Sequence, residues 1–302
     1  MGNPKFDLDT FWKTVPAPYS VGFTEAIDTV QRQIETGRAP GYMTGIPSLD
    51  KFVRLIKSEY MLIGGRSGDG KTAMAMQLID TVEKQRKERG VTNEMTVFFS
   101  AEMNKETLAM RHAAKMTGIS QWQIQSGAAS RTELQTFLAA LQDARPMYRD
   151  IFVDETSNPT IDHMLEHLTI LQKEWNIGLV VFDYLELSGE PGGSENLRIA
   201  AISRGMKAIA KHFRCSTLGL SQLSRSVEQR ADKTPKMSDI MYGGEREPDR
   251  IVLLQRSEEQ EDRTDAYVVK NRNGPTGKAT MIFDGPRQLF ASAEVKRTPL
   301  NP

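Results

Sequence analysis

The chain has 302 residues, of which 39% are hydrophobic and 26% charged, and this composition is typical of a soluble globular protein with a sizeable core. Lys and Arg together number 39, as do Asp and Glu, so no global basic excess indicates a nucleic-acid partner. The single cysteine, Cys215, excludes an intrachain disulfide, and we expect it to be a buried small hydrophobic residue. The sequence has no membrane-spanning apolar stretch and no apolar signal core near its N-terminus, so we expect a cytoplasmic protein without a membrane partner.

The first 39 residues are predicted to form an extended arm followed by a short helix. Three prolines lie within the first 18 residues and favour an extended backbone. A helix is predicted over 21–36, because apolar residues recur every three or four positions and Gly37 follows as a stop signal. These apolar residues are Phe23, Ile27, Val30 and Ile34. The pattern leaves open whether this helix packs on its own domain or on another subunit.

The stretch EYMLIGGRSGDGKTAMAMQ, from Glu59 to Gln77, predicts a strand, a glycine loop and a helix in that order. Its loop fits the phosphate-binding pattern G-x-x-x-x-G-K-[ST], in which backbone N–H groups surround a phosphate, the lysine contacts it and the hydroxyl binds Mg²⁺. The alternative is a chance glycine turn before a helix. The predicted nucleotide-binding residues are Gly65, Arg66, Ser67, Gly68, Asp69, Gly70, Lys71 and Thr72.

Strands and helices alternate through the next part of the chain. Further strands are predicted near 95–99, 151–153, 179–182 and 216–220, and helices over 73–87, 104–117, 131–144, 160–175 and 196–213. This alternation predicts an α/β fold with a mostly parallel sheet flanked by helices. Four strands without helices follow near 251–255, 265–270, 278–283 and 288–291, so we expect a C-terminal antiparallel β extension.

Three polar residues follow predicted strands and are candidates for hydrolytic chemistry. Asp183 ends an apolar strand, where a second Mg²⁺-organising carboxylate is needed. Glu102 can polarise a water against the γ-phosphate, although an acid near a helix N-terminus is the simpler alternative. Gln222 can connect the γ-phosphate to the loop that follows it.

Two cations, Lys270 and Arg272, end a predicted strand before a glycine-proline turn. Their simpler role is a solvated edge that blocks strand pairing. An arginine inserted into a phosphoryl-transfer site nevertheless accelerates the reaction by roughly 10³–10⁵. If the chain forms a ring, this turn is the candidate donor to the neighbouring site.

His163 and His167 match the zinc pattern H-x-x-E-H. On a helix, however, they lie opposite the apolar stripe, and neither His112 nor His212 offers an evident third ligand. We therefore expect a solvated helix face rather than a zinc site.

Several segments, in order, resemble a known family. They are TGIPSLD, GGRSGDGKT, FSAEM, LVVFDYLEL, ENLRIAAISRGMKAIA, LSQLSRSVEQRADKTPKMSD and VKNRNGPTG. Over about residues 40–290 the chain resembles the C-terminal RecA-like ATPase domain of DnaB-type replicative helicases, in superfamily 4. The resemblance implies a hexameric ring with ATP at subunit interfaces that translocates on single-stranded DNA with 5'-3' polarity. It divides the chain into an arm and linker helix (1–39), a RecA-like helicase ATPase domain (40–295) and a tail (296–302).

The resemblance also implies roles for individual residues. Lys71 and Thr72 would bind phosphate and Mg²⁺, Asp183 would be the second magnesium carboxylate, and Glu102 would be the base. Gln222 would act as sensor, Arg272 as arginine finger and Lys270 as its companion. The DNA-binding candidates in the loop 224–244 are Arg225, Arg230, Lys233, Lys236, Tyr242, Gly243 and Gly244.

This sequence departs from the family in two places. The family's R-E-S-G-like run after Ser238-Asp239 is replaced by Ile240-Met241-Tyr242-Gly243-Gly244-Glu245, which weakens the inference of DNA binding. The family's globular N-terminal domain is not recognised, so a ring would rest on the helix 21–36 and the ATPase interface. The alternatives are a RecA-like recombination ATPase and a DnaB-like regulatory or loader ATPase without unwinding activity. Primase or loader partners are left open.

Overall fold

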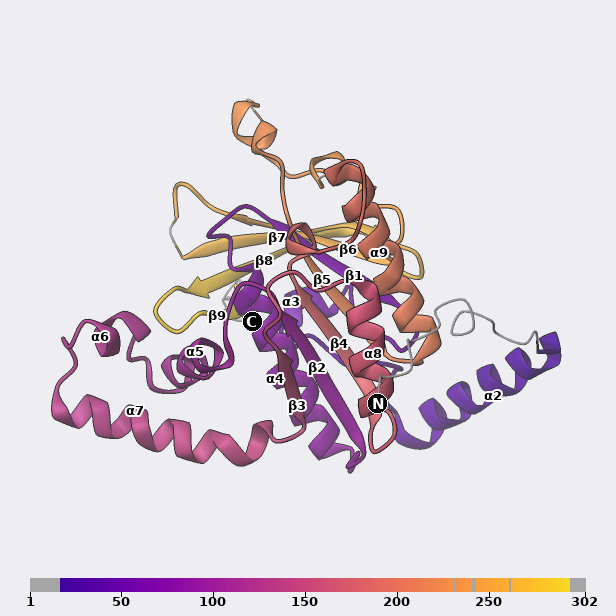
Figure 1. Cartoon of the computed structure of the whole chain (residues 1–302), viewed down its shortest axis with the longest axis horizontal. Coiled ribbons are helices and arrows are strands. Elements are labelled where there is room, and N and C mark those ends of the chain that lie inside the picture. The colour runs from indigo at the N-terminus through magenta and orange to yellow at the C-terminus, as the bar shows by residue number, and fades with distance from the viewer. Residues whose placement is uncertain (1–16, 231, 241–242, 261, 294–302) are drawn as a thin grey trace, which may run out of the picture.

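The computed structural model describes residues 17–293 apart from 231, 241, 242 and 261. Its centre is a nine-stranded sheet in the order β3-β2-β4-β5-β1-β6-β7-β8-β9 (Figure 1). The strands are β1 (Tyr60–Gly65), β2 (Glu94–Ser100), β3 (Ile151–Asp154), β4 (Asn176–Asp183), β5 (Ser216–Gln222), β6 (Arg250–Arg256), β7 (Arg263–Asn271), β8 (Gly277–Asp284) and β9 (Leu289–Ser292). The α-helices are α2 (Tyr19–Thr36), α3 (Pro47–Asp50), α4 (Lys71–Glu88), α5 (Lys105–Thr117), α6 (Gln121–Gln125), α7 (Arg131–Ala144), α8 (Ile161–Leu171) and α9 (Glu195–His212).

The predicted α/β class, the mostly parallel sheet and the C-terminal antiparallel extension are confirmed. β6 joins this extension to the core: it pairs parallel to β1, with Leu62 opposite Ile251, and antiparallel to β7. The pairs β7–β8 and β8–β9 are antiparallel as well. Between the end of β5 and the start of β6, the described part of the segment 223–249 contains short 3-10 turns, and the chain returns to the end of the sheet where the parallel strands begin. A parallel connection of this kind usually contains an α-helix, so these 3-10 turns are a less common form of it.

Helices cover both faces of the sheet because successive strand residues point to opposite sides. Phe98 packs in the core beneath α4, whereas Phe99 packs in the core beneath α8 and α9. All but the first residue of β4 are buried. The buried Cys215 belongs to the second core, as predicted, and burial raises the pKa of its thiol to about 12.

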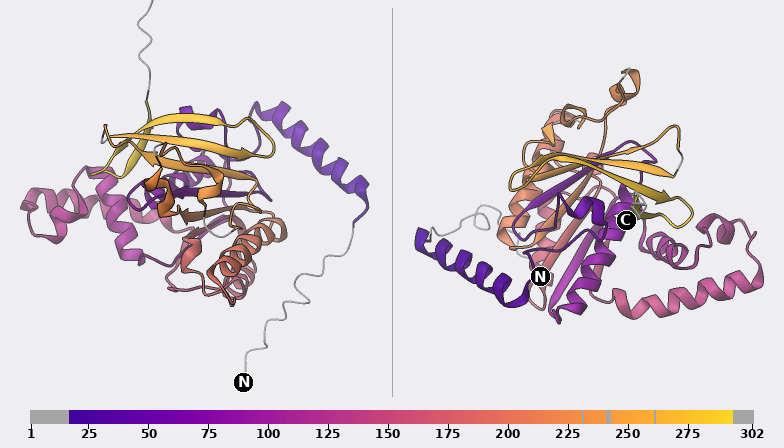
Figure 2. Two further views of the ribbon diagram at one scale, coloured as in Figure 1. Left: turned by 90° about the horizontal axis from the view of Figure 1, so that it is seen from above. Right: turned by 180° about the vertical axis from the view of Figure 1, so that it is seen from behind.

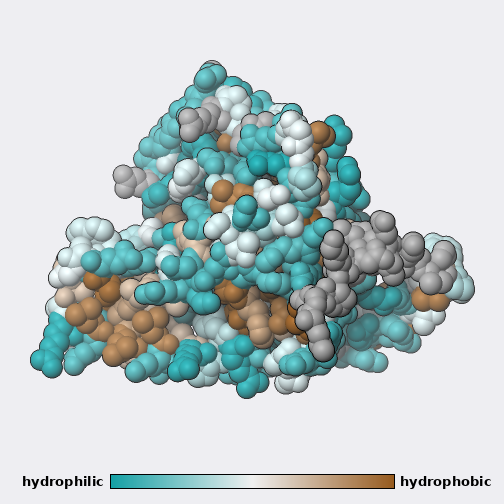
Figure 3. Space-filling view, in the orientation of Figure 1, coloured by the Kyte–Doolittle hydropathy of each residue, from teal (hydrophilic) through white to brown (hydrophobic). Residues whose placement is uncertain are grey.

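Two helical parts extend from the body on opposite sides (Figures 1 and 2). α5, α6 and α7 form a lobe on one side, and Figure 3 shows apolar residues gathered on the face of that lobe. α2 extends on the other side and has no buried residue. Residue 37 follows α2 in the left-handed conformation, with φ of 65°, as its glycine predicts.

Two helix predictions need correction. α8 ends at Leu171, four residues before the predicted end at 175, and the short helix α6 was not predicted. None of the helices within the described ranges combines the length and apolar character needed to cross a membrane.

Candidate active site

The conformation of the loop between β1 and α4 is fixed by two glycines and by hydrogen bonds to the side chain of Asp69. Gly68 and Gly70 adopt φ values of 87° and 89°, a region that favours glycine. The buried carboxylate of Asp69 accepts hydrogen bonds from the backbone N–H of Arg66 at 2.7 Å and of Arg256 at 3.3 Å. Burial raises the pKa of Asp69, while these two hydrogen bonds oppose the change. The loop is thereby anchored to the end of β6.

Lys71 lies at the first position of α4 and its ammonium group folds over the same loop. Its Nζ atom donates to the carbonyl oxygens of Gly65 and Arg66, both at 3.0 Å. Burial lowers the pKa of Lys71, and the carboxylates of Asp183 and Asp69 oppose that effect. A positive charge and the helix N-terminus therefore lie together at the mouth of the loop.

Thr72 and Asp183 form the part of the site that fits Mg²⁺. The Thr72 hydroxyl donates to Asp183 Oδ2 at 2.7 Å, so α4 and the end of β4 are joined. The other carboxylate oxygen, Oδ1, is buried and accepts no hydrogen bond from the described residues. Burial raises the pKa of Asp183 from 3.8 to about 6. A hydroxyl beside a carboxylate with an unused buried oxygen suits a cation that prefers oxygen ligands.

Two further predicted residues, Glu102 and Gln222, line one cavity of about 430 Å³ together with the loop. Glu102, two residues beyond β2, and Gln222, the last residue of β5, both border this cavity beside Lys71 and Thr72. Gln222 is held by Glu186, whose Oε1 accepts from the Gln222 backbone N–H at 3.0 Å. The structure thus brings together the residues predicted from the ends of three neighbouring strands.

Arg111 on α5 also borders the cavity and was missed in the sequence. Burial lowers its pKa, and the carboxylates of Asp183 and Glu102 oppose this change. Arg111 lies three residues after the buried Leu108, so its position on the inward side of α5 was a usable signal. The other lining residues that were missed are Ala73, Met103, Tyr184, Arg256, Phe283, Gly285 and Gln288.

Arg272 is not part of this cavity. Its backbone N–H donates to the Asp249 carbonyl oxygen at 3.0 Å, and its Nη1 lies 3.7 Å from Asp249 Oδ1. Asp249 in turn accepts from the backbone N–H of Tyr60, the first residue of β1, at 2.8 Å. The phosphate loop begins at the other end of β1, five residues further, which corresponds to roughly 17 Å along a strand. The Arg272 side chain is 51% exposed. It lies at the end of the sheet where β1 begins, whereas the phosphate loop of the same subunit lies where β1 ends.

Lys270 lies at the same edge and is engaged with backbone carbonyls. Its Nζ atom donates to the carbonyl oxygens of Glu245 at 3.0 Å and Arg246 at 2.9 Å. Burial lowers its pKa, as does the nearby positive charge of Arg272.

The described cations of the predicted DNA-binding loop are paired with acids. Arg230 donates to both carboxylate oxygens of the buried Asp239, at 2.9 and 2.7 Å, and Lys233 donates to both oxygens of Glu258 at 2.8 Å. Lys236 lies 3.6 Å from Asp232. Gly243 has a φ of 82°, and the Gly244 carbonyl oxygen accepts from the Ser203 hydroxyl at 2.9 Å. Tyr242 and the Arg225 side chain lie outside the described part of the chain.

Comparison with known proteins places this geometry in context. Residues 41–292 match the model of the DnaB-like helicase C terminal domain. The replicative DNA helicase DnaB of Geobacillus stearothermophilus is 30% identical over 273 residues, which is 85% of this chain and 58% of the relative. That of Buchnera aphidicola subsp. Acyrthosiphon pisum is 32% identical over 257 residues, or 81% of this chain and 54% of the relative. The chain therefore spans somewhat more than half the length of these curated relatives.

Solved structures show the same fold. The ATPase domain of G40P superposes with a TM-score of 0.77 at 24% identity, covering 93% of this chain and 100% of that one. A DnaB-like replicative helicase studied with primase superposes with a TM-score of 0.76 at 23% identity, covering 93% of this chain and 68% of that one.

Proposed function

The chain belongs to the DnaB-like helicase C-terminal domain family, and from this premise we propose that it is the ATP-hydrolysing motor of a ring helicase. The motor moves along single-stranded DNA with 5'-3' polarity and unwinds duplex DNA during replication. The observation that carries the proposal is the separation of Arg272 from the phosphate loop of its own subunit, which a ring of identical subunits would explain. In the proposed domain division, 1–39 is an arm and linker helix, 40–295 is the motor and 296–302 is a tail.

The chemistry follows from the cavity's polar groups. Lys71 and the loop N–H groups hold the β- and γ-phosphates, while Thr72 and Asp183 provide the oxygen atoms for Mg²⁺. When bound, Mg²⁺ neutralises charge that develops on the transferred phosphoryl group. Glu102 accepts a proton from the attacking water, and Gln222 reports the presence of the γ-phosphate to the loop that follows β5.

Arg272 completes the site of the neighbouring subunit in this proposal. Arg272 directly follows β7, and its exposed guanidinium lies beside Asp249. It therefore projects from the end of the sheet opposite the phosphate loop. A guanidinium offers two parallel donors to a phosphate, a geometry that lysine lacks. Lys270 is its companion at the same edge.

A helix and a groove also support assembly of identical subunits into a hexamer. The apolar side chains Phe23, Ile27, Val30 and Ile34 of α2 are 60%, 55%, 55% and 77% exposed. On the other side of the molecule, a largely apolar cavity of about 590 Å³ lies between α4, α5, α7 and the edge of the sheet. An amphipathic helix that places such side chains into an apolar groove is a common mode of association. We propose that α2 binds this cavity of the adjacent subunit.

DNA would bind along the loop 224–244, and primase is the proposed protein partner because the solved DnaB-like neighbour was studied with primase. The cations Arg230, Lys233 and Lys236 must exchange their carboxylate partners for DNA phosphates. Such binding depends strongly on salt concentration, because each phosphate contact releases counterions.

The first test measures ATPase rate with and without single-stranded DNA, unwinding of a forked duplex, and particle mass with nucleotide. The proposal expects DNA-stimulated hydrolysis, unwinding and a mass of six subunits. Hydrolysis without unwinding would instead indicate a regulatory ATPase, and helical polymers on DNA would indicate a recombination ATPase.

The second test mixes two inactive variants, Glu102→Gln and Arg272→Ala, under conditions of subunit exchange. Some interfaces in a mixed ring combine the intact base of an Arg272→Ala subunit with the intact arginine of a Glu102→Gln subunit, so ATPase activity should recover. Lys278→Ala serves as the matched control, because Lys278 is a half-exposed cation on the same β extension. This variant should hydrolyse ATP without being mixed with another. No recovery in verified mixed rings would remove Arg272 from the neighbouring site.

A further inference from the structure

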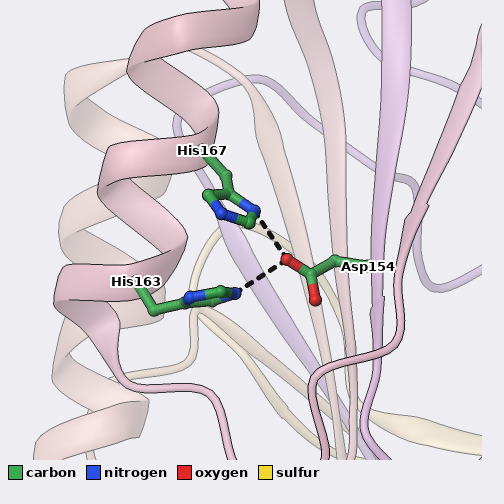
Figure 4. A group of neighbouring side chains, drawn as sticks. All are labelled: Asp154, His163 and His167. Carbon is green, nitrogen blue, oxygen red and sulfur yellow. Dashed lines mark hydrogen bonds and ion pairs between the residues drawn. The ribbon is translucent and has the colours of Figure 1, made fainter.

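His163 and His167 on α8 meet a third group that the sequence did not reveal. His163 Nε2 lies 2.8 Å and His167 Nδ1 lies 2.6 Å from the same oxygen, Oδ2 of Asp154 (Figure 4). Asp154 is the last residue of β3, so it approaches the helix from the edge of the sheet. The expectation of a merely solvated histidine face is therefore wrong, because a carboxylate faces both imidazoles.

These three side chains have the composition and spacing of a metal-ligand set. Their nitrogen and oxygen ligand atoms all lie within 4.8 Å of one another, and all three residues are partly buried. Ligands around a tetrahedral ion with bonds of about 2.0–2.1 Å are about 3.3 Å apart, so the contacts of 2.8 and 2.6 Å to Asp154 need to open by only about 0.5 and about 0.7 Å. His163 and His167 are 27% and 43% exposed, which leaves their side chains room for this adjustment.

The carboxylate and one histidine are also oriented by their surroundings. Asp154 Oδ1 accepts from the backbone N–H of Thr156 at 2.8 Å, which leaves Oδ2 directed toward the histidines. The Phe99 ring meets the His163 ring edge to face, with centroids 6.4 Å apart. Such fixed neighbours limit the orientations of ligands and strengthen metal binding.

We propose that Asp154, His163 and His167 bind one divalent transition-metal ion of the zinc, cobalt or nickel type. Two imidazoles favour these ions over Mg²⁺ and Ca²⁺, which prefer oxygen ligands. The fourth position is open to water, and the ion ties α8 to the end of the edge strand β3. This site is separate from the nucleotide cavity, because Asp154 pairs with Phe99 and faces α8, whereas Asp183 faces α4.

The site is not the hydrolytic centre that the H-x-x-E-H pattern indicates. In that pattern the glutamate is a catalytic group beside the metal. Here Glu166 is exposed and lies outside the ligand cluster, and the third ligand, Asp154, comes from the preceding strand β3, nine residues before His163. The proposed role of the ion is thus to join two elements.

The test titrates Co²⁺ into the nucleotide-free full chain after chelator treatment and follows the visible absorption of the bound ion. We expect one equivalent of Co²⁺ in a four- or five-coordinate site without a sulfur ligand, since Cys215 is buried elsewhere, and displacement of Co²⁺ by one equivalent of Zn²⁺. Asp154→Ala, His163→Ala and His167→Ala should each weaken binding by about 100-fold or more, because loss of partners outside the ligand set already costs about 10–100-fold.

His212→Ala and Glu166→Gln are the matched controls and should bind Co²⁺ as the unaltered chain does. His167→Gln provides a further variant at the most exposed ligand, where folding is least at risk, and circular dichroism checks each fold. The proposal is overturned if the unaltered chain gives no such absorption, if the absorption survives all three ligand substitutions, or if His212→Ala removes it equally.

Discussion

Replacing Asp183 with Asn should stabilise the nucleotide-free protein at neutral pH and abolish magnesium-dependent ATP hydrolysis. Burial raises the pKa of this carboxyl from 3.8 to about 6 in the folded chain. The two values differ by about 2 pH units at about 1.4 kcal/mol each, so ionised Asp183 costs the folded state about 3 kcal/mol. Asn removes that charge and still offers a carbonyl oxygen to the Thr72 hydroxyl.

The sign of the pH dependence follows from the raised pKa. Below about pH 4 the carboxyl is protonated in both the folded and the unfolded chain, so Asp and Asn variants should have similar stability. As the pH rises through about 6, the unaltered protein loses the stability associated with its bound proton. The advantage of Asp183→Asn should therefore grow from near zero at about pH 4 to about 3 kcal/mol at about pH 8.

Urea unfolding at several pH values, with a chelator and without nucleotide, measures this difference. Asp28→Asn on the exposed helix α2 is the control and should show no such trend. Mg²⁺ and ATP should stabilise the unaltered chain by about 2.7 kcal/mol when the free ligand concentration is 100 times the dissociation constant. The same concentrations should stabilise Asp183→Asn less. A stability difference that does not change with pH would refute the argument that burial raises the pKa of Asp183.

Three further predictions concern catalysis and packing. Lys71→Ala should lose ATP binding, whereas Glu102→Gln should bind ATP but not hydrolyse it, because Glu102 acts mainly in the transition state; near-normal phosphate release by Glu102→Gln would exclude it as the base. Gly205→Ala should lower the free energy of unfolding by about 1–3 kcal/mol, because the added Cβ overlaps the Cγ1 and Cδ1 atoms of Ile161, and urea unfolding should show a smaller loss in an Ile161→Ala background, which lacks both atoms. Arg230→Ala should cost about 1–3 kcal/mol by leaving the buried Asp239 without its two-point partner, and an unchanged melting temperature would contradict this.

Local signals in the sequence predicted the bounds of most elements to within about three residues. α7 begins and ends at the predicted residues 131 and 144, and its start is fixed by a capping box between Ser130 and Glu133. α8 ends earlier than its apolar pattern indicates, because Trp175 continues the apolar stripe but packs against the core beyond the helix. Periodicity identifies buried positions and does not by itself show where the backbone leaves the helix.

Relations between distant segments were harder to predict. The phosphate loop and the residues Asp183 and Gln222 were found because each directly follows or ends an apolar strand. Arg111 lies within a helix and belongs to no recognised motif. Asp154 is only nine residues before His163, but the two meet through the packing of α8 on the edge strand β3, which no known motif with this spacing indicates. The direction of β6 depends on the route of the chain between two strands, which no short pattern encodes.

β1 carries the phosphate loop at one end and contacts the anchor of Arg272, Asp249, at the other. If neighbouring subunits share a site through these two ends, their contact is head-to-tail and joins unlike surfaces. A contact of this kind propagates until the rotation between successive subunits closes a full circle, and without closure it yields a helical filament. The catalytic residues are then identical in both assemblies. In the proposed assembly, the angle at which α2 meets the next subunit would decide between them.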